Sequence, residues 1–109
     1  LQRRRSAVAA LTNWPEERVW ERYQELLAQA LEPRLHAQLL MSTAAAFGAR
    51  SLDTLATFLE RDEVELRRAA VQAARLVGVD AKALLASQAE RELDATLRGE
   101  IERALGDLD

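Results

Sequence analysis

Residues 62–88 read DEVELRRAAVQAARLVGVDAKALLASQ, and this stretch decides the fold. Small and apolar residues recur in it at the spacing of a helix face, and Gly78 interrupts them. An acidic residue opens each half, Asp62 before the first apolar run and Asp80 before the second. Asp is a favoured N-cap, and Asp62 with Glu65 three residues later has the spacing of a capping box. The stretch therefore predicts two helices joined by a turn at a glycine.

The same pattern recurs along the chain. Residues 39–62 match the sequence 30 residues later, so that Gly48 falls on Gly78, and Arg98 matches Arg67 at a shift of 31. A helix–turn–helix unit with a period of about 30 residues is the signature of a solenoid. One helix pair cannot bury its apolar face alone, whereas stacked neighbours can. We expect about three and a half such units, at about residues 1–31, 33–60, 62–90 and 94–109.

Helix periodicity continues outside this stretch, and no segment shows convincing strand alternation. A first helix is expected from about Gln2 to Leu11, and a second from Pro15. A third is expected from Pro33 to a stop at Gly48. The remaining N-caps are expected at Ser51 and Asp94, before the apolar runs that follow them. The fold class predicted is all-α.

The side chains of the repeat suggest how the helices pack. We expect small residues to let neighbouring first helices approach closely, at Ala69, Ala70, Ala73 and Ala74. Bulkier residues are expected to fill the space between the layers, at Phe47, Leu55, Phe58, Leu76 and Leu85. Near the N-terminus, Trp20 and Tyr23 are expected in the first interlayer core and Trp14 over the turn. Any of these three that is exposed would be a good anchor for a protein partner.

The composition excludes several classes of protein. Of the 109 residues, 49% are apolar and 30% charged, as in a folded globular domain. The chain has no cysteine, which excludes disulfides, thiolate nucleophiles and Cys-ligated zinc. No apolar run reaches the length of about 18 residues that a membrane span needs. We expect a cytoplasmic protein and, because the sequence lacks an initiator Met and ends in mid-pattern, a piece of a longer chain.

The sequence predicts no catalytic, metal or cofactor site. Gly48 and Gly78 precede helices but belong to no phosphate-binding motif, so both are interpreted as helix stops. His36 is the single histidine and is expected at a solvated helix position. The hydroxyls of Ser42, Thr43 and Ser51 have no histidine or lysine placed to activate them. Thr43 and Ser42 are expected to hydrogen-bond locally or to pack.

The charge pattern disfavours a nucleic-acid partner. The formal net charge is −3, and acidic residues accompany every basic cluster except Arg3-Arg4-Arg5. The numerous carboxylates are interpreted as helix caps and surface ion pairs. Arg67 and Arg98 occupy matching repeat positions, which predicts a structural role for both, with Asp80 as the suggested partner of Arg67. Gly48, Gly78, Arg67, Asp80 and Arg98 are therefore the predicted structural residues.

Residues 62–88 resemble a HEAT-like helical repeat of the short bacterial type. The resemblance rests on the acidic start at Asp62, the Leu66-Arg67 pair, the small residues of the first helix, the stop at Gly78 and the second helix from Asp80. The match is fair over residues 33–60, partial over 94–109 and weak over 1–31. It implies a right-handed stack of helix pairs. The motif is degenerate, so it indicates an architecture and leaves function open.

The expected function is that of a non-catalytic scaffold or adaptor that binds a protein or peptide. The partner should lie on the face of the second helices and have basic character, since that face is mildly acidic. Further repeats of a parent chain are also expected partners. The alternatives are a helper domain of an enzyme, as in helical-repeat chromophore lyases and alkylated-base glycosylases, or a nucleic-acid binder. The partner-binding residues predicted are Arg22, Glu25, Gln29, Asp53, Thr57, Glu60, Lys82 and Gln88.

Overall fold

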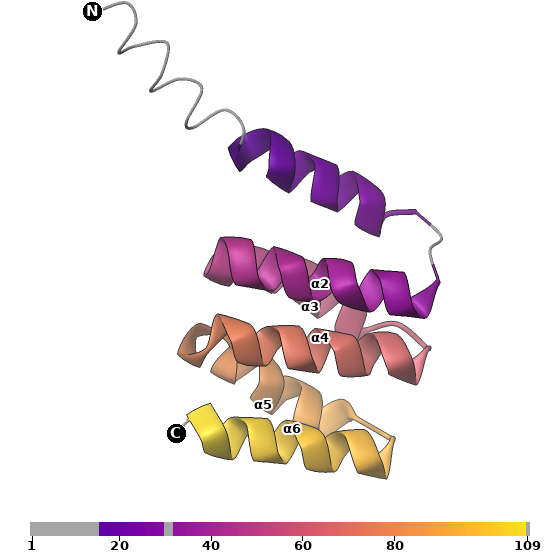
Figure 1. The fold of residues 1–109 in the computed structure, drawn as a ribbon. Helices are drawn as coiled ribbons and strands as arrows, with labels where there is room; N and C mark the ends of the chain where they lie inside the picture. The colour runs from indigo at the N-terminus through magenta and orange to yellow at the C-terminus, as the bar shows by residue number, and fades with distance from the viewer. Residues whose placement is uncertain (1–15, 30–31, 109) are drawn as a thin grey trace, which may run out of the picture. The chain divides into compact units, whose positions relative to one another are not determined.

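The computed structural model describes residues 16–29 and 32–108, and all regular structure in these two ranges is helical (Figure 1). The predicted all-α class is confirmed. The chain divides between Ala30 and Leu31 into two compact units, each of which is treated by itself below. The helix expected over residues 2–11, the start expected at Pro15 and the position of Trp14 lie outside the described residues.

The described part of the first unit is one helix followed by a turn. Residues 16–27 are helical, with Leu27 buried and Val19 exposed. Trp20 and Tyr23 are both half-buried, so neither is a freely exposed aromatic anchor. Arg22 and Glu25 form an exposed ion pair one helical turn apart, with a distance of 3.3 Å between Nη1 and Oε2.

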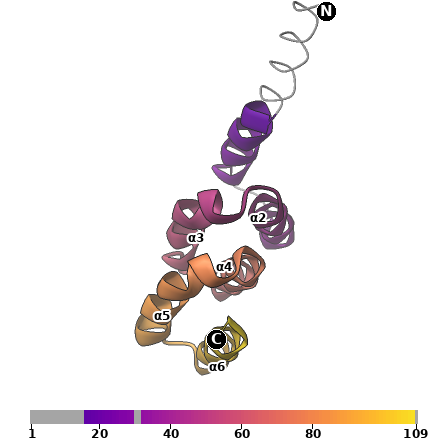
Figure 2. The ribbon, with the colours of Figure 1, turned by 90° about the vertical axis from the view of Figure 1, so that its left-hand side faces the viewer.

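Five α-helices and two short 3₁₀ turns make up the described part of the second unit. They are α2 (Pro33–Phe47), η1 (Gly48–Ser51), α3 (Leu52–Leu59), α4 (Val64–Val77), η2 (Val79–Ala81), α5 (Lys82–Arg91) and α6 (Ala95–Leu108). Helices α2, α4 and α6 lie side by side in one layer, while α3 and α5 form a second layer (Figures 1 and 2). Helix α4 is central, because it packs against α2, α3 and α6.

Glycine ends the first helix of each complete pair, as the sequence predicts. Gly48 follows α2 with a φ of 54° and Gly78 follows α4 with a φ of 92°. Side chains rarely adopt these conformations, so only glycine fits without strain. The amide of each glycine still donates to a carbonyl four residues back, that of Ala44 or Ala74. Each glycine thus closes one helix and turns the chain into the next.

The predicted N-caps are correct at one of four positions. The amide of Leu97 donates to Oδ1 of Asp94 at 2.8 Å, so Asp94 caps α6 as expected. Ser51 does not cap α3. It lies in a 3₁₀ turn with helical backbone angles, and its buried hydroxyl donates back to the carbonyl of Gly48 at 2.6 Å. An N-cap side chain reaches the first amides of a helix when its own backbone is extended. Where a 3₁₀ turn leads directly into the helix, the residue at this position has helical angles instead.

The same geometry explains the error at Asp80, whereas the error at Asp62 is a shift of one residue along the chain. Asp80 lies within η2, and the N-cap of α5 is Ala81, again with helical backbone angles. At α4 the N-cap is Glu63, one residue later than predicted, and no side chain caps it. The capping box expected between Asp62 and Glu65 is therefore absent from the described structure.

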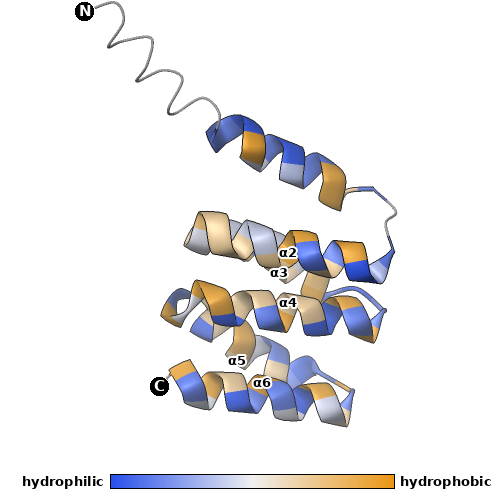
Figure 3. Cartoon of the chain, viewed as in Figure 1, coloured by the Kyte–Doolittle hydropathy of each residue, from blue (hydrophilic) through white to orange (hydrophobic). Residues whose placement is uncertain are grey.

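The core lies between the two layers and along the seams of α4. The four alanines of α4 are buried, as predicted, together with Leu55, Phe58 and Leu85. Phe47 is half-buried. Leu76 was expected in the core but is 52% exposed, one residue before the end of α4. Apolar and polar residues are interspersed along each helix (Figure 3).

The prediction of a solvated His36 is wrong. Its side chain is buried and meets the ring of Phe58 edge to face, with 5.4 Å between ring centroids. A shift of 30 residues places His36 on Leu66, and a further shift of 31 places Leu66 on Leu97; both leucines are buried. The repeat itself therefore carried the signal that this position faces the core. Thr43 is also buried, and its hydroxyl donates to the carbonyl of Leu39 at 2.7 Å, the local bond that was expected.

Candidate functional site

The exposed face of α3 and α5 contains most of the predicted partner-binding residues of the second unit. Asp53, Thr57, Glu60 and Lys82 are all exposed. Gln88 is a correction, because its side chain is buried. In the first unit, Arg22, Glu25 and Gln29 are exposed as well.

Gln88 is buried because it belongs to the inner stripe of α5. Ala81, Leu85, Gln88 and Glu92 are all buried and follow one another at spacings of four, three and four residues. This is the spacing of a single helix face. The predicted face lies on the opposite side, and Gln88 was assigned to the wrong one.

Carboxylates without partners mark the exposed face of the second helices. The side chains of Asp53 and Glu90 make no hydrogen bond or ion pair within the part of the chain that the structure describes. Glu60 is joined only loosely to Arg91, at 4.0 Å. Arg91 has a closer partner than Glu60, because it donates a hydrogen bond to the side-chain oxygen of Gln88 at 2.8 Å. Acceptors are therefore in excess on this face.

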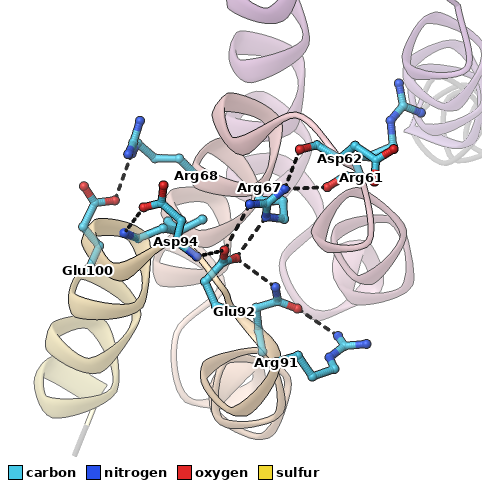
Figure 4. A network of polar contacts seen from close by, with 10 residues as sticks. Arg61, Asp62, Arg67, Arg68, Arg91, Glu92, Asp94 and Glu100 are labelled. Carbon is cyan, nitrogen blue, oxygen red and sulfur yellow. Dashed lines mark hydrogen bonds and ion pairs between the residues drawn. The ribbon is translucent and has the colours of Figure 1, made fainter.

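Behind the ends of α3 and α5 lies a buried ion pair between Arg67 of α4 and Glu92 (Figure 4). Two parallel hydrogen bonds join them, from Nε to Oε1 and from Nη2 to Oε2, each 3.0 Å long. Nη1 of Arg67 donates to the backbone carbonyls of Arg61 and Asp62, at 2.8 and 2.7 Å. One guanidinium thus links α4 to the turn before it and to the end of α5.

The carboxylate of Glu92 is satisfied from every side. Besides Arg67, it accepts hydrogen bonds from Nε2 of Gln88 at 3.1 Å and from the amide of Asp94 at 3.0 Å. Burial by itself raises the pKa of Glu92, but the hydrogen bonds from Arg67, Asp94 and Gln88 outweigh it and leave the pKa below its ordinary value. The hydrogen bonds to Glu92 in turn raise the pKa of Arg67. Both groups are therefore charged at neutral pH.

Arg67 has the predicted structural role, but its partner was assigned wrongly. The sequence suggested Asp80, which is exposed and lies in η2, the turn that follows the C-terminal end of α4. Arg67 is in the first turn of α4, so the residues that reach it come from the opposite end of the helix pair. Glu92 was missed because the sequence does not distinguish it from the surrounding exposed acids.

Arg98 shows no equivalent cross-link. It is exposed, and its side chain makes no ion pair with any of the described residues. Arg67 finds its acid 25 residues later. The same offset from Arg98 would fall beyond residue 109.

Two further ion pairs join α4 to α6 on the surface of the first layer. Arg68 pairs with Glu100 at 3.1 Å, and Arg75 pairs with Asp107. Both partners are displaced by seven residues, about two helical turns, so the pairs form two rungs along parallel helices. The corresponding positions of α2 are Gln38 and Ala45, so α2 and α4 lack this pairing.

An open pocket of about 520 Å³ lies beside the buried ion pair, at the turns that follow α3 and α5. Arg67 and Glu92 form part of its lining. Its rim is formed by exposed charged side chains and by Leu93, which is 95% exposed. The lining residues are Leu59, Glu60, Arg61, Asp62, Arg67, Gln88, Arg91, Glu92 and Leu93.

Three observations on the described residues concern metal binding, the candidate polar side chains and membrane spans. No group of three or more His, Cys, Asp or Glu side chains among them is placed to hold a metal ion. The buried hydroxyl of Ser51 is bonded to a backbone carbonyl, and the single histidine packs against Phe58. In residues 16–29 and 32–108, no helix is long and apolar enough to cross a bilayer.

Comparisons with known proteins add no relative: the sequence matches no protein-family model, no curated protein and no solved structure.

Proposed function

We propose that this chain is a non-catalytic interaction module that binds a protein or peptide of basic character on the exposed face of α3 and α5. The observation that carries the proposal is the excess of carboxylates there, with Asp53 and Glu90 exposed and without partners among the described residues. Complementary charge steers a partner to such a face and fixes its orientation. We place this activity in the cytoplasm.

The architecture we propose is a right-handed HEAT-like solenoid, of which α2–α3 and α4–α5 are two complete pairs. The two-layer arrangement supports this, with first helices in one layer and second helices in the other. So does the repeated stop at Gly48 and Gly78. In such a stack the second helices form one continuous surface, and the buried Arg67–Glu92 pair would hold neighbouring second helices in a fixed relation.

The test is a binding measurement with charge-reversed variants. A partner is first isolated by affinity capture with the purified chain as bait, and its binding to that chain is then measured by calorimetry. Asp53→Lys and Glu90→Lys should each weaken binding several-fold, and the double variant should weaken it further, because like charges then face each other. Lys82→Glu should strengthen it or leave it unchanged.

Glu65→Lys is the matched control. Glu65 is also an exposed acid, but it belongs to α4 in the other layer. Its reversal changes the net charge by the same amount and should leave the affinity within about twofold, since it lies away from the proposed face. Equal weakening by Glu65→Lys, or unchanged binding by the Asp53 and Glu90 variants, would sink the proposed face.

A further inference from the structure

Measured from helix start to helix start, the α5–α6 segment is one residue longer than the matching α3–α4 segment. The starts of α3 and α4 are 12 residues apart, at Leu52 and Val64, and the starts of α5 and α6 are 13 apart, at Lys82 and Ala95. The Glu60-Arg61 pair matches Glu90-Arg91 at a shift of 30, so the additional residue comes after position 91. It belongs to residues 92–94, where Leu93 is the exposed one.

Leu93 is held in place by its neighbours rather than by its own packing. The amide of Glu92 donates to the carbonyl of Gln88 at 2.8 Å, and the carboxylate of Glu92 is fixed by Arg67. On the other side, the amide of Asp94 is bound to Glu92 and the Asp94 side chain caps α6. A single exposed leucine is ordinary on a protein surface. This one is projected by a turn that is anchored on both sides, and it lines a pocket.

The charges around the pocket favour a basic occupant. Each arginine of the rim already has a partner: Arg67 has Glu92, Arg91 has Gln88, and Arg61 has Glu63 at 3.5 Å and the ring of Phe58 at 5.4 Å. The carboxylate of Asp62 makes no hydrogen bond within the described chain, and Glu60 has only its 4.0 Å contact. The carboxylates of Glu60 and Asp62 can therefore still accept hydrogen bonds from a partner, next to the apolar side chain of Leu93.

We propose that Leu93 and the adjoining pocket form an anchor site for a segment of the partner that alternates apolar and basic side chains. The apolar side chain would cover Leu93, and a lysine or arginine beside it would pair with Glu60 and Asp62. Apolar anchors enclosed by a polar rim dominate many protein interfaces. The inference rests on the proposed function, and it adds a specific contact at the ends of the second helices.

Peptide titration followed by two-dimensional ¹H–¹⁵N NMR tests the site. The probe is an acetylated, amidated hexapeptide of alternating lysine and leucine. Its counterparts replace lysine by glutamate or leucine by serine. The lysine–leucine peptide should shift the amide signals of residues 59–62 and 91–94 saturably, and the other two should not. Leu93→Ser should weaken its binding by about tenfold or more.

Val79→Ser is the control, because Val79 is an exposed apolar residue of η2, outside the pocket lining. It should bind the probe as the unmodified chain does, and urea unfolding should show that neither variant loses stability. Shifts confined to exposed positions of α3 and α5 would overturn the anchor site and leave the proposed function standing. Preference for the glutamate peptide, unchanged binding by Leu93→Ser, or no saturable binding would each overturn the anchor site as well.

Discussion

The guanidinium of Arg67 faces the carboxylate of Glu92 through two hydrogen bonds of 3.0 Å, across 25 residues of sequence. The side chain of Glu92 is 1% exposed and that of Arg67 16% exposed. Replacing one member of such a pair leaves the other as a buried charge without a counter-ion. Replacing both by apolar residues leaves no buried charge. The pair therefore specifies how α4 meets the end of α5, and its contribution is best seen in single and double variants.

Arg67→Met should lower the free energy of unfolding by about 3 kcal/mol, because Glu92 is left buried without its counter-ion. Arg67→Met combined with Glu92→Met should be less destabilised than Arg67→Met alone. Urea denaturation of the four proteins in the cycle measures this. A double variant that loses the sum of the two single losses would show that the residues do not act as a pair.

Stability should fall in acid through Glu92. The pKa of Glu92 is lowered in the folded chain from an ordinary value near 4.5, so the unfolded chain takes up this proton first as the pH decreases. The contribution is thus fully present above about pH 4.5 and is lost as the pH falls through the folded pKa. Arg67 stays cationic throughout. The urea midpoint, followed from pH 7 to pH 3, should fall less steeply for Glu92→Gln than for the natural chain; parallel profiles would contradict this.

Glycine to alanine should have opposite effects at two positions. Gly78→Ala should destabilise the chain by about 1–3 kcal/mol, because its φ of 92° is strained for any L side chain. Gly99 lies inside α6, and an added methyl group would meet no atom within 4 Å. Gly99→Ala should therefore stabilise the chain by about 0.5–1 kcal/mol. Thermal unfolding of both variants decides the matter, and a loss of stability at Gly99 would show that the methyl group is not accommodated.

Replacing leucine by alanine should destabilise the chain much more at a core position than at a surface position. Leu85 is fully buried, and Leu85→Ala should cost about 2–5 kcal/mol. Leu76→Ala should cost less than about 1 kcal/mol, since half of that side chain is already in water. Urea denaturation measures both variants. Similar losses for the two would place Leu76 in the core after all.

The sequence was a good guide to the elements and a poor one to individual polar contacts. Helix periodicity and the glycine stops predicted α2–α6, because both follow from local backbone preferences. The N-caps failed at Ser51 and Asp80 because the chain enters α3 and α5 through a 3₁₀ turn, which depends on how each pair closes.

The candidate site was predicted only in part, for a similar reason. Asp53 and Lys82 are exposed as expected, since helix phase alone decides their side. Glu92 is one acid among many in sequence, and only the tertiary approach of α4 shows that it is buried. Leu93 resembles a core residue by type, and its exposure depends on how Glu92 and Asp94 hold the turn around it.

The two stops at Gly48 and Gly78 also have a stereochemical consequence. Their backbone angles, φ 54° with ψ −127° and φ 92° with ψ −145°, are mirror images of extended conformations that ordinary L-residues adopt freely. A Cβ added at either glycine would meet no atom within 4 Å, so the strain of an L-residue there comes from the backbone angles. In a chemically synthesised chain, D-alanine would adopt these backbone angles without strain, and it would restrict the unfolded chain more than glycine does. Glycine is thus required at these turns because of the positive φ angle, and not because a side chain would lack room.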